Sequence, residues 1–100
     1  MLGNTLRLIR IANNDMSVNY VAGQMKMPSR YIRRIESGQA KLSLSILTSF
    51  SDFYQIPISQ ILIFNDFKER LKVSDEEALE HIKRYCVCGI DEEKGKQKTK

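Results

Sequence analysis

Residues 17–38 read SVNYVAGQMKMPSRYIRRIESG, and this stretch decides the fold. Ser17 is a good cap for a short helix that carries Val21 among its apolar positions. Pro28 suits the first turn of a second helix, because its missing N–H is not needed there. Gly38 follows where a left-handed residue commonly ends a helix. The stretch therefore predicts two short helices joined by a tight turn, with arginines on the second helix.

Further helices are expected on both sides of this pair. Thr5 and Ser43 are capping residues, each followed by apolar residues at helical spacing. Ser74 and Glu77 form a capping box that starts a last helix, and Gly89 is expected to end it. No alternating strand pattern occurs, so we expect an all-α chain. The further helices are predicted over residues 6–12, 44–54, 58–62 and 75 to 86 or 87.

Three linked motifs carry a family resemblance. Leu6–Arg10 reads L-R-x-x-R, Val21 and Ala22 supply V-A, and Ile32–Gly38 reads I-x-x-I-E-x-G before the next apolar helix. With these motifs at their mutual spacing, Leu6–Leu62 resembles the Xre/Cro/C1-type helix-turn-helix domain of phage repressors and bacterial regulators. The resemblance implies a five-helix lambda-repressor-like DNA-binding domain, here with an additional C-terminal helix.

The resemblance also implies a set of DNA contacts. Val18–Gln24 corresponds to the supporting helix, and Ser29–Ile35 to the recognition helix that enters the major groove. The implied base contacts are Ser29, Arg30, Arg33 and Arg34. The implied phosphate contacts, which set register without reading sequence, are Asn19, Gln39 and Lys41. Arg10 and Glu36 stand where family members often place a structural ion pair.

The chain departs from the family pattern at Val18, at Lys26, at Pro28, which replaces the common Ser or Thr cap, and in a loop one residue longer between the first two helices. Val18 stands where a glutamine often contacts phosphate, so one expected contact is missing. Lys26 replaces the usual glycine of the turn, and we expect it in a left-handed conformation at some energetic cost. These departures leave the fold prediction unchanged.

The charge distribution favours a polyanion as partner. The chain has 100 residues and a formal net charge of +4. Residues 1–50 carry +5, residues 51–90 carry −2 and residues 91–100 carry +1. The excess positive charge thus lies in the half that holds the recognition helix, although exposed cations can also be merely a solvated helix face.

The chain divides on sequence grounds into three parts. Residues 1–66 are predicted to form the DNA-binding domain, residues 67–90 a helical extension and residues 91–100 a flexible basic tail. The extension has an apolar stripe, formed by Ala78, Leu79, Ile82, Tyr85 and Cys86. We expect this apolar stripe to make a self-complementary dimer contact; the alternative is that it completes the core of the chain itself.

These patterns predict a transcriptional regulator, a repressor that binds double-stranded operator DNA as a homodimer. We expect no enzymatic activity, cofactor or metal, because the single histidine has no obvious nucleophile partner and neither a phosphate-binding glycine loop nor a four-ligand metal set occurs. The chain also has no apolar run long enough for a membrane span and no export signal, so a cytoplasmic location is expected.

Two alternative functions remain open at this point. One is an interaction protein, such as an antitoxin, that binds another protein through its C-terminal helix and DNA only secondarily. The other is a redox or metal sensor built on Cys86 and Cys88, with His81 nearby in the sequence. Cys86 also fits the apolar stripe as a small core residue.

Overall fold

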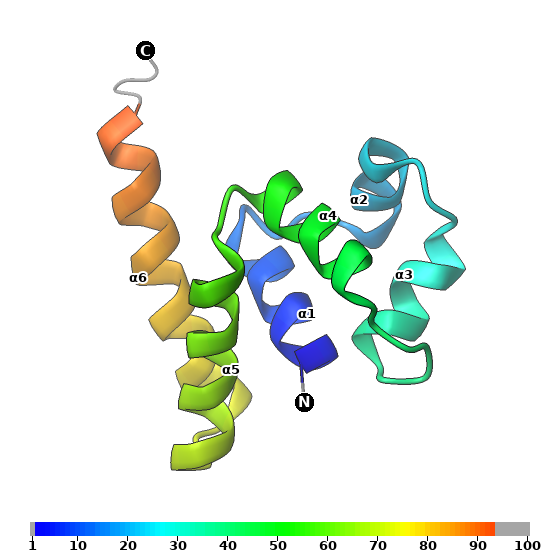
Figure 1. Cartoon of the computed structure of the whole chain (residues 1–100). Coiled ribbons are helices and arrows are strands. Elements are labelled where there is room, and N and C mark those ends of the chain that lie inside the picture. Colours follow the sequence, from blue (N-terminus) through cyan, green and yellow to red (C-terminus); the bar gives the residue numbers. More distant parts are fainter. Residues whose placement is uncertain (1, 94–100) are drawn as a thin grey trace.

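The computed structural model describes the backbone of residues 2–93 and the side chains of residues 2–86. Helices are the only regular secondary structure in this part of the chain, which has no strands, so the all-α prediction is confirmed. Figure 1 shows the arrangement of the helices. They are α1 (Leu2–Ala12), α2 (Val18–Met25), α3 (Ser29–Glu36), α4 (Leu44–Tyr54), α5 (Ile58–Leu71) and α6 (Asp75–Glu93).

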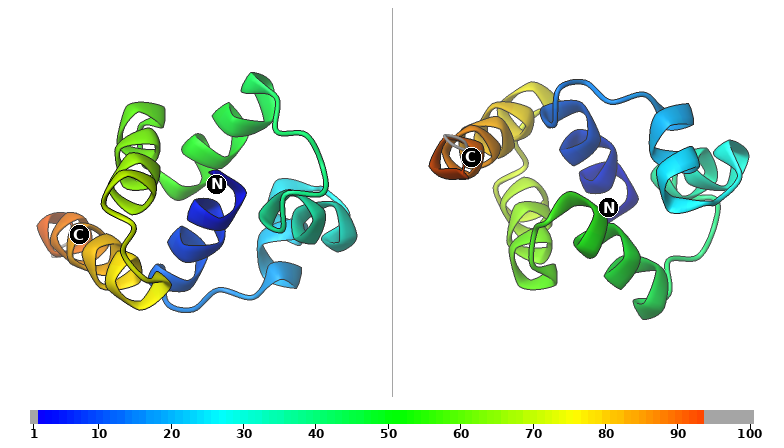
Figure 2. Two further views of the ribbon diagram at one scale, coloured as in Figure 1. Left: turned by 90° about the horizontal axis from the view of Figure 1, so that it is seen from below. Right: turned by 90° about the horizontal axis from the view of Figure 1, so that it is seen from above.

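Helix α1 lies at the centre of the fold. It contacts α3 on one side and α5 and α6 on the other, and it also touches α4. Both views in Figure 2 show it between these two groups of helices. Leu6 and Ile9 are completely buried and Leu8 nearly so, which means that α1 packs through more than one face. A helix buried on several faces fixes the positions of all its neighbours.

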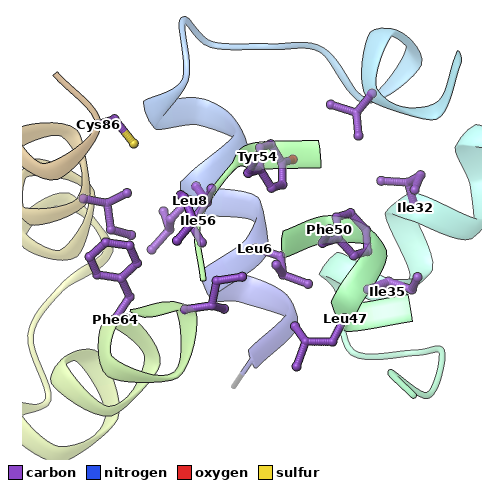
Figure 3. Close-up of a cluster of buried hydrophobic side chains, with 14 of the residues drawn as sticks. Leu6, Leu8, Ile32, Ile35, Leu47, Phe50, Tyr54, Ile56, Phe64 and Cys86 are labelled. Carbon is purple, nitrogen blue, oxygen red and sulfur yellow. The ribbon is translucent and has the colours of Figure 1, made fainter. Parts of the chain in front are cut away.

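One hydrophobic core joins all six helices. Phe50 of α4 and Ile32 of α3 are fully buried on one side of α1 (Figure 3). Phe64 of α5 and Cys86 of α6 lie on its other side. Because the buried residues form a single cluster, the helix pair predicted from residues 17–38 is stabilised by the same core as the C-terminal helix.

The backbones of α1 and α3 approach each other closely at Gly3. A Cβ atom built on Gly3 would collide with the carbonyl oxygen of Ile35 and lie 3.2 Å from that of Glu36. Both obstacles are backbone atoms of α3, which cannot rotate away as a side chain could. The glycine is therefore required for the position of α3 against α1.

The C-terminal helix α6 packs against α1 and α5. We predicted a dimer contact for its apolar stripe, but Ala78, Ile82 and Cys86 are buried in the chain's own core. Within the stripe, Leu79 is half-buried and Tyr85 is exposed. The alternative interpretation was therefore the better one, because α1 and α5 offer this helix an apolar surface within the same chain.

Asp75 fastens the first turn of α6 to both neighbouring helices. Its carboxylate oxygens lie 3.1 Å from the amide nitrogen of Asn4, from the guanidinium of Arg7 and from the ammonium group of Lys68. The hydrogen bond from Lys68 is the main reason that the pKa of Asp75 lies below its ordinary value. Any stability gained from this carboxylate is present above its unfolded-state pKa and is lost as the pH falls through the folded-state pKa.

Several predicted boundaries differ from the structure. Helix α1 begins at Leu2, because Thr5 does not cap it but is buried and donates its hydroxyl hydrogen bond to Asn65 at 2.9 Å. Helix α5 continues beyond the predicted end at Leu62, as far as Leu71. Helix α6 passes through Gly89, which was expected to end it, because a glycine inside a helix costs only about 1 kcal/mol. The predicted domain boundary at residue 66 therefore falls inside α5.

Residues 91–93 of the predicted flexible tail belong to α6 instead, and the rest of the predicted tail, residues 94–100, lies outside the described residues. No helix in the described part of the chain is both long and apolar enough to cross a membrane.

Two glycines allow a matched test of the packing of α1 on α3. Gly3→Ala should lower the free energy of unfolding by about 1–3 kcal/mol, because the new methyl group meets the backbone of α3. Gly23→Ala is the control: a Cβ atom at this position would have no atom within 4 Å, and alanine should raise helix stability by about 0.5–1 kcal/mol. Urea denaturation measures both values. Equal stability of the two variants would contradict the close approach.

Candidate nucleic-acid interface

The pair α2 and α3 is held by a turn with a left-handed residue. Ser17 caps α2 by accepting a hydrogen bond from the N–H of Tyr20 at 3.0 Å. Lys26 ends α2 with φ 59° and ψ 45°, which is the left-handed conformation predicted for it. The backbone N–H of Lys26 is directed to the carbonyl groups of Ala22 and Gly23, so the left-handed residue caps the C-terminal end of α2. Pro28 then begins α3 without a side-chain cap.

Helix α3 presents an apolar face inward and a cationic face outward. Ile32, Ile35 and Glu36 are buried. Arg30, Arg33 and Arg34 are exposed, and we call these three residues the arginine face. Among the described residues, no carboxylate forms an ion pair with any of their guanidinium groups. The three cations are therefore available to an external partner.

Arg10 of α1 and Glu36 of α3 form a two-pronged ion pair. Nε and Nη2 of Arg10 donate to the two carboxylate oxygens of Glu36 at 2.9 and 3.0 Å. The third nitrogen of Arg10, Nη1, donates to the carbonyl group of Met16 at 2.7 Å. The side chains are only 12% and 5% exposed. The hydrogen bond with Glu36 is the main reason that the pKa of Arg10 is raised above its ordinary value.

This ion pair has two consequences for α3. Glu36 is the only acidic residue of the helix, and its charge is neutralised inside the protein instead of being presented beside the arginine face. The pair also ties the C-terminal end of α3 to α1. Removing either partner from such a buried pair commonly costs about 3–5 kcal/mol, because an unpaired charge remains.

Tyr54 lies in the same part of the core. Its side chain is 6% exposed, and its hydroxyl oxygen has no hydrogen-bond partner among the described residues. Burial raises the pKa of this hydroxyl above its ordinary value, with a further contribution from the charge of Glu36. Tyr54 therefore stays neutral, and we assign it to the core and not to the interface.

The structure links two of the predicted contact residues to each other. Ser29 of α3 donates its hydroxyl hydrogen bond to the side-chain oxygen of Asn19 in α2, at 2.7 Å. No sequence pattern indicated this bond, which joins residues ten positions apart. Gln39 and Lys41 are exposed in the segment that follows α3, C-terminal to the arginine face. The predicted residues thus fall on α2, on α3 and on the segment that follows α3.

The residues of the sensor hypothesis lie elsewhere. His81 of α6 stacks on Phe67 of α5, with ring centroids 4.3 Å apart. The Cys86 thiol is buried, and this burial raises its pKa, which disfavours the reactive thiolate. The side chain of Cys88 lies outside the described residues. Within the described part of the chain, no three His, Cys, Asp or Glu side chains are grouped to hold a metal ion.

Comparison with protein families agrees with this geometry. The family model described as helix-turn-helix, of the Xre and lambda-repressor-like type, matches residues 6–61, which is more than half of the chain. The chain belongs to this helix-turn-helix family. The match begins in α1 and ends in α5, so α6 lies outside it. No curated protein and no solved structure matches the chain.

Membership of the family gives the helix pair its function. α2 and α3 form a DNA-binding helix-turn-helix of the class found in transcriptional regulators. α3 is the second helix of the pair, the one that enters the major groove in this motif.

Proposed function

We propose that this helix-turn-helix protein is a transcriptional repressor that binds a palindromic operator as a homodimer. The observation that carries the proposal is the arginine face, with three exposed arginines and the only carboxylate of α3 turned inward. Such a surface attracts the phosphate backbone and offers forked donors to base edges. Repression requires only that the protein occupy the operator.

The residues around the arginine face support this orientation. Asn19 sits in the first turn of α2, whose N-terminal N–H groups favour an anion, and Lys41 adds a cation beyond the end of α3. We assign Asn19, Gln39 and Lys41 to phosphate contacts on the two sides of the groove. Arg30, Arg33 and Arg34 are assigned to the bases. The Ser29 hydroxyl serves mainly to hold Asn19 in position.

A dimer fits the exposed apolar residues of α5. Leu62 is 46% and Ile63 55% exposed, and they are neighbours on the outer side of this helix. Adjacent exposed apolar side chains lose contact with water when a second chain covers them, and this favours association. A two-fold dimer of such domains places its recognition helices in successive major grooves, about 34 Å apart. We therefore assign the dimer contact to α5 instead of to the apolar stripe of α6.

The two alternative functions receive less support. A protein partner bound through the apolar stripe of α6 would have to displace side chains that are already buried, namely Ala78, Ile82 and Cys86. A thiol sensor needs an accessible thiolate, whereas Cys86 is buried and its pKa is raised. The interface with DNA requires no such rearrangement.

The DNA-contact assignment can be tested with DNA selected by the protein from a random library. Arg30→Ala and Arg34→Ala should each weaken binding to the selected sequence by roughly 5- to 150-fold, as expected for the loss of a base contact. Arg70→Ala is the matched control, because Arg70 is an exposed arginine of α5 that pairs with Asp66. Fluorescence anisotropy gives the affinities. Unchanged affinity for the two α3 variants would show that the assignment is wrong.

The proposed dimer contact can be tested independently of DNA. Replacing Leu62 and Ile63 together by aspartate should weaken dimerisation by roughly 100-fold or more, since two apolar side chains per chain would be replaced by charges. Leu71→Asp is the control, because Leu71 is 60% exposed at the end of the same helix. Sedimentation equilibrium measures the association. A wild-type chain that is monomeric at high concentration would contradict the proposal.

A further inference from the structure

We infer that the operator half-site contains at least two guanines within three consecutive base pairs, and that the arginine face reads them in the major groove. This inference rests on the proposed DNA-binding function. It adds the identity of the bases, which the fold alone leaves open.

The first step of the argument is the placement of the three arginines. Successive residues of a helix are rotated by about 100° and rise by about 1.5 Å. Arg30, Arg33 and Arg34 therefore lie within an arc of roughly 100° and within about 6 Å along the axis of α3. Since base pairs are stacked about 3.4 Å apart, the arginine face spans two or three consecutive base pairs.

The second step is the chemistry of the outward surface of α3. Arginine matches guanine, because its fork donates to O6 and N7 together. The outward surface of α3 has no Asn or Gln for adenine and no exposed carboxylate for cytosine. Ser29 already donates its hydroxyl proton to Asn19. Guanine is thus the base that this surface is equipped to select.

The third step is that the guanidinium groups are free. No carboxylate of the described residues pairs with Arg30, Arg33 or Arg34. Arg30 also stands in the first turn of α3, where a positive charge opposes the helix dipole and no acidic residue compensates it. The arrangement is unfavourable for the isolated helix and suits an external acceptor such as the O6 and N7 atoms of guanine.

The experiment substitutes single atoms of the DNA. The full-length protein first selects its preferred duplex from a random library, and each guanine of a half-site is then replaced by 7-deazaguanine, which lacks N7. Inosine at the same position is the matched control, because it keeps O6 and N7 and lacks only the minor-groove amino group. We expect 7-deazaguanine to weaken binding by about tenfold at two or more positions within three consecutive base pairs. Inosine should leave the affinity within about twofold of that for guanine.

Protein variants supply a second readout on the same duplexes. Arg30→Lys and Arg33→Lys keep the positive charge but replace the planar guanidinium fork by a single flexible ammonium group, which holds O6 and N7 less firmly. They should therefore lose most of the discrimination against 7-deazaguanine while retaining binding to random-sequence DNA. Arg70→Lys in α5 is the control and should behave like the unmodified protein. Circular dichroism checks that each variant is folded.

The outcomes separate this inference from the proposed function. If the protein selects no sequence at all, the proposed function is wrong. If it selects a sequence but 7-deazaguanine has no effect anywhere in the half-site, DNA binding stands and the guanine inference is overturned. In that case the arginines contact phosphates, and the Lys variants should bind the guanine and 7-deazaguanine duplexes with equal affinity, as the unmodified protein does.

Discussion

The buried ion pair between Arg10 and Glu36 is the interaction on which the interface depends. It connects the central helix α1 to the end of α3 through two hydrogen bonds of 2.9 and 3.0 Å. A buried pair of this kind adds little net stability compared with apolar residues, but it is costly to break and demands a fixed geometry. Its value to this protein is therefore the defined position of α3 and the removal of one negative charge from its surface.

Helix α1 transmits this constraint to the rest of the molecule. On one side it meets α3 at Gly3, so closely that a methyl group would collide with the backbone. On the other side it carries α6, whose first turn is held by the hydrogen bonds and ion pairs of Asp75. The helix-turn-helix and the C-terminal helix thus share one support. A change that loosens α6 would weaken the same core that positions α3.

The sequence predicted the helix pair well because its signals are local. Ser17, Pro28 and the short turn act within a few residues of their own position, and the left-handed Lys26 followed from the glycine usually found there. The structure also joins Arg10 to Glu36, the two residues that the family resemblance placed together. Local capping and family spacing therefore predict the helix pair, its turn and this ion pair.

The remaining features depend on contacts between distant segments. Helical periodicity showed that one face of α6 is buried but not which surface buries it, so the stripe was assigned to a second copy. Thr5 has the side chain of a cap, yet its partner is Asn65, sixty residues away. The bond between Ser29 and Asn19 depends on how α2 crosses α3. None of these partners can be read from spacing along the chain.

The most direct test of the central claim is the rate at which arginine side-chain Nε–H protons exchange with water, measured by NMR with and without selected DNA. The account predicts slow exchange for Arg10 in both states, because its Nε donates to Glu36. Arg30, Arg33 and Arg34 should exchange rapidly in the free protein and become protected in the complex. Rapid exchange of Arg10 in the free protein, or a complex that leaves all three α3 arginines unprotected, would contradict the account.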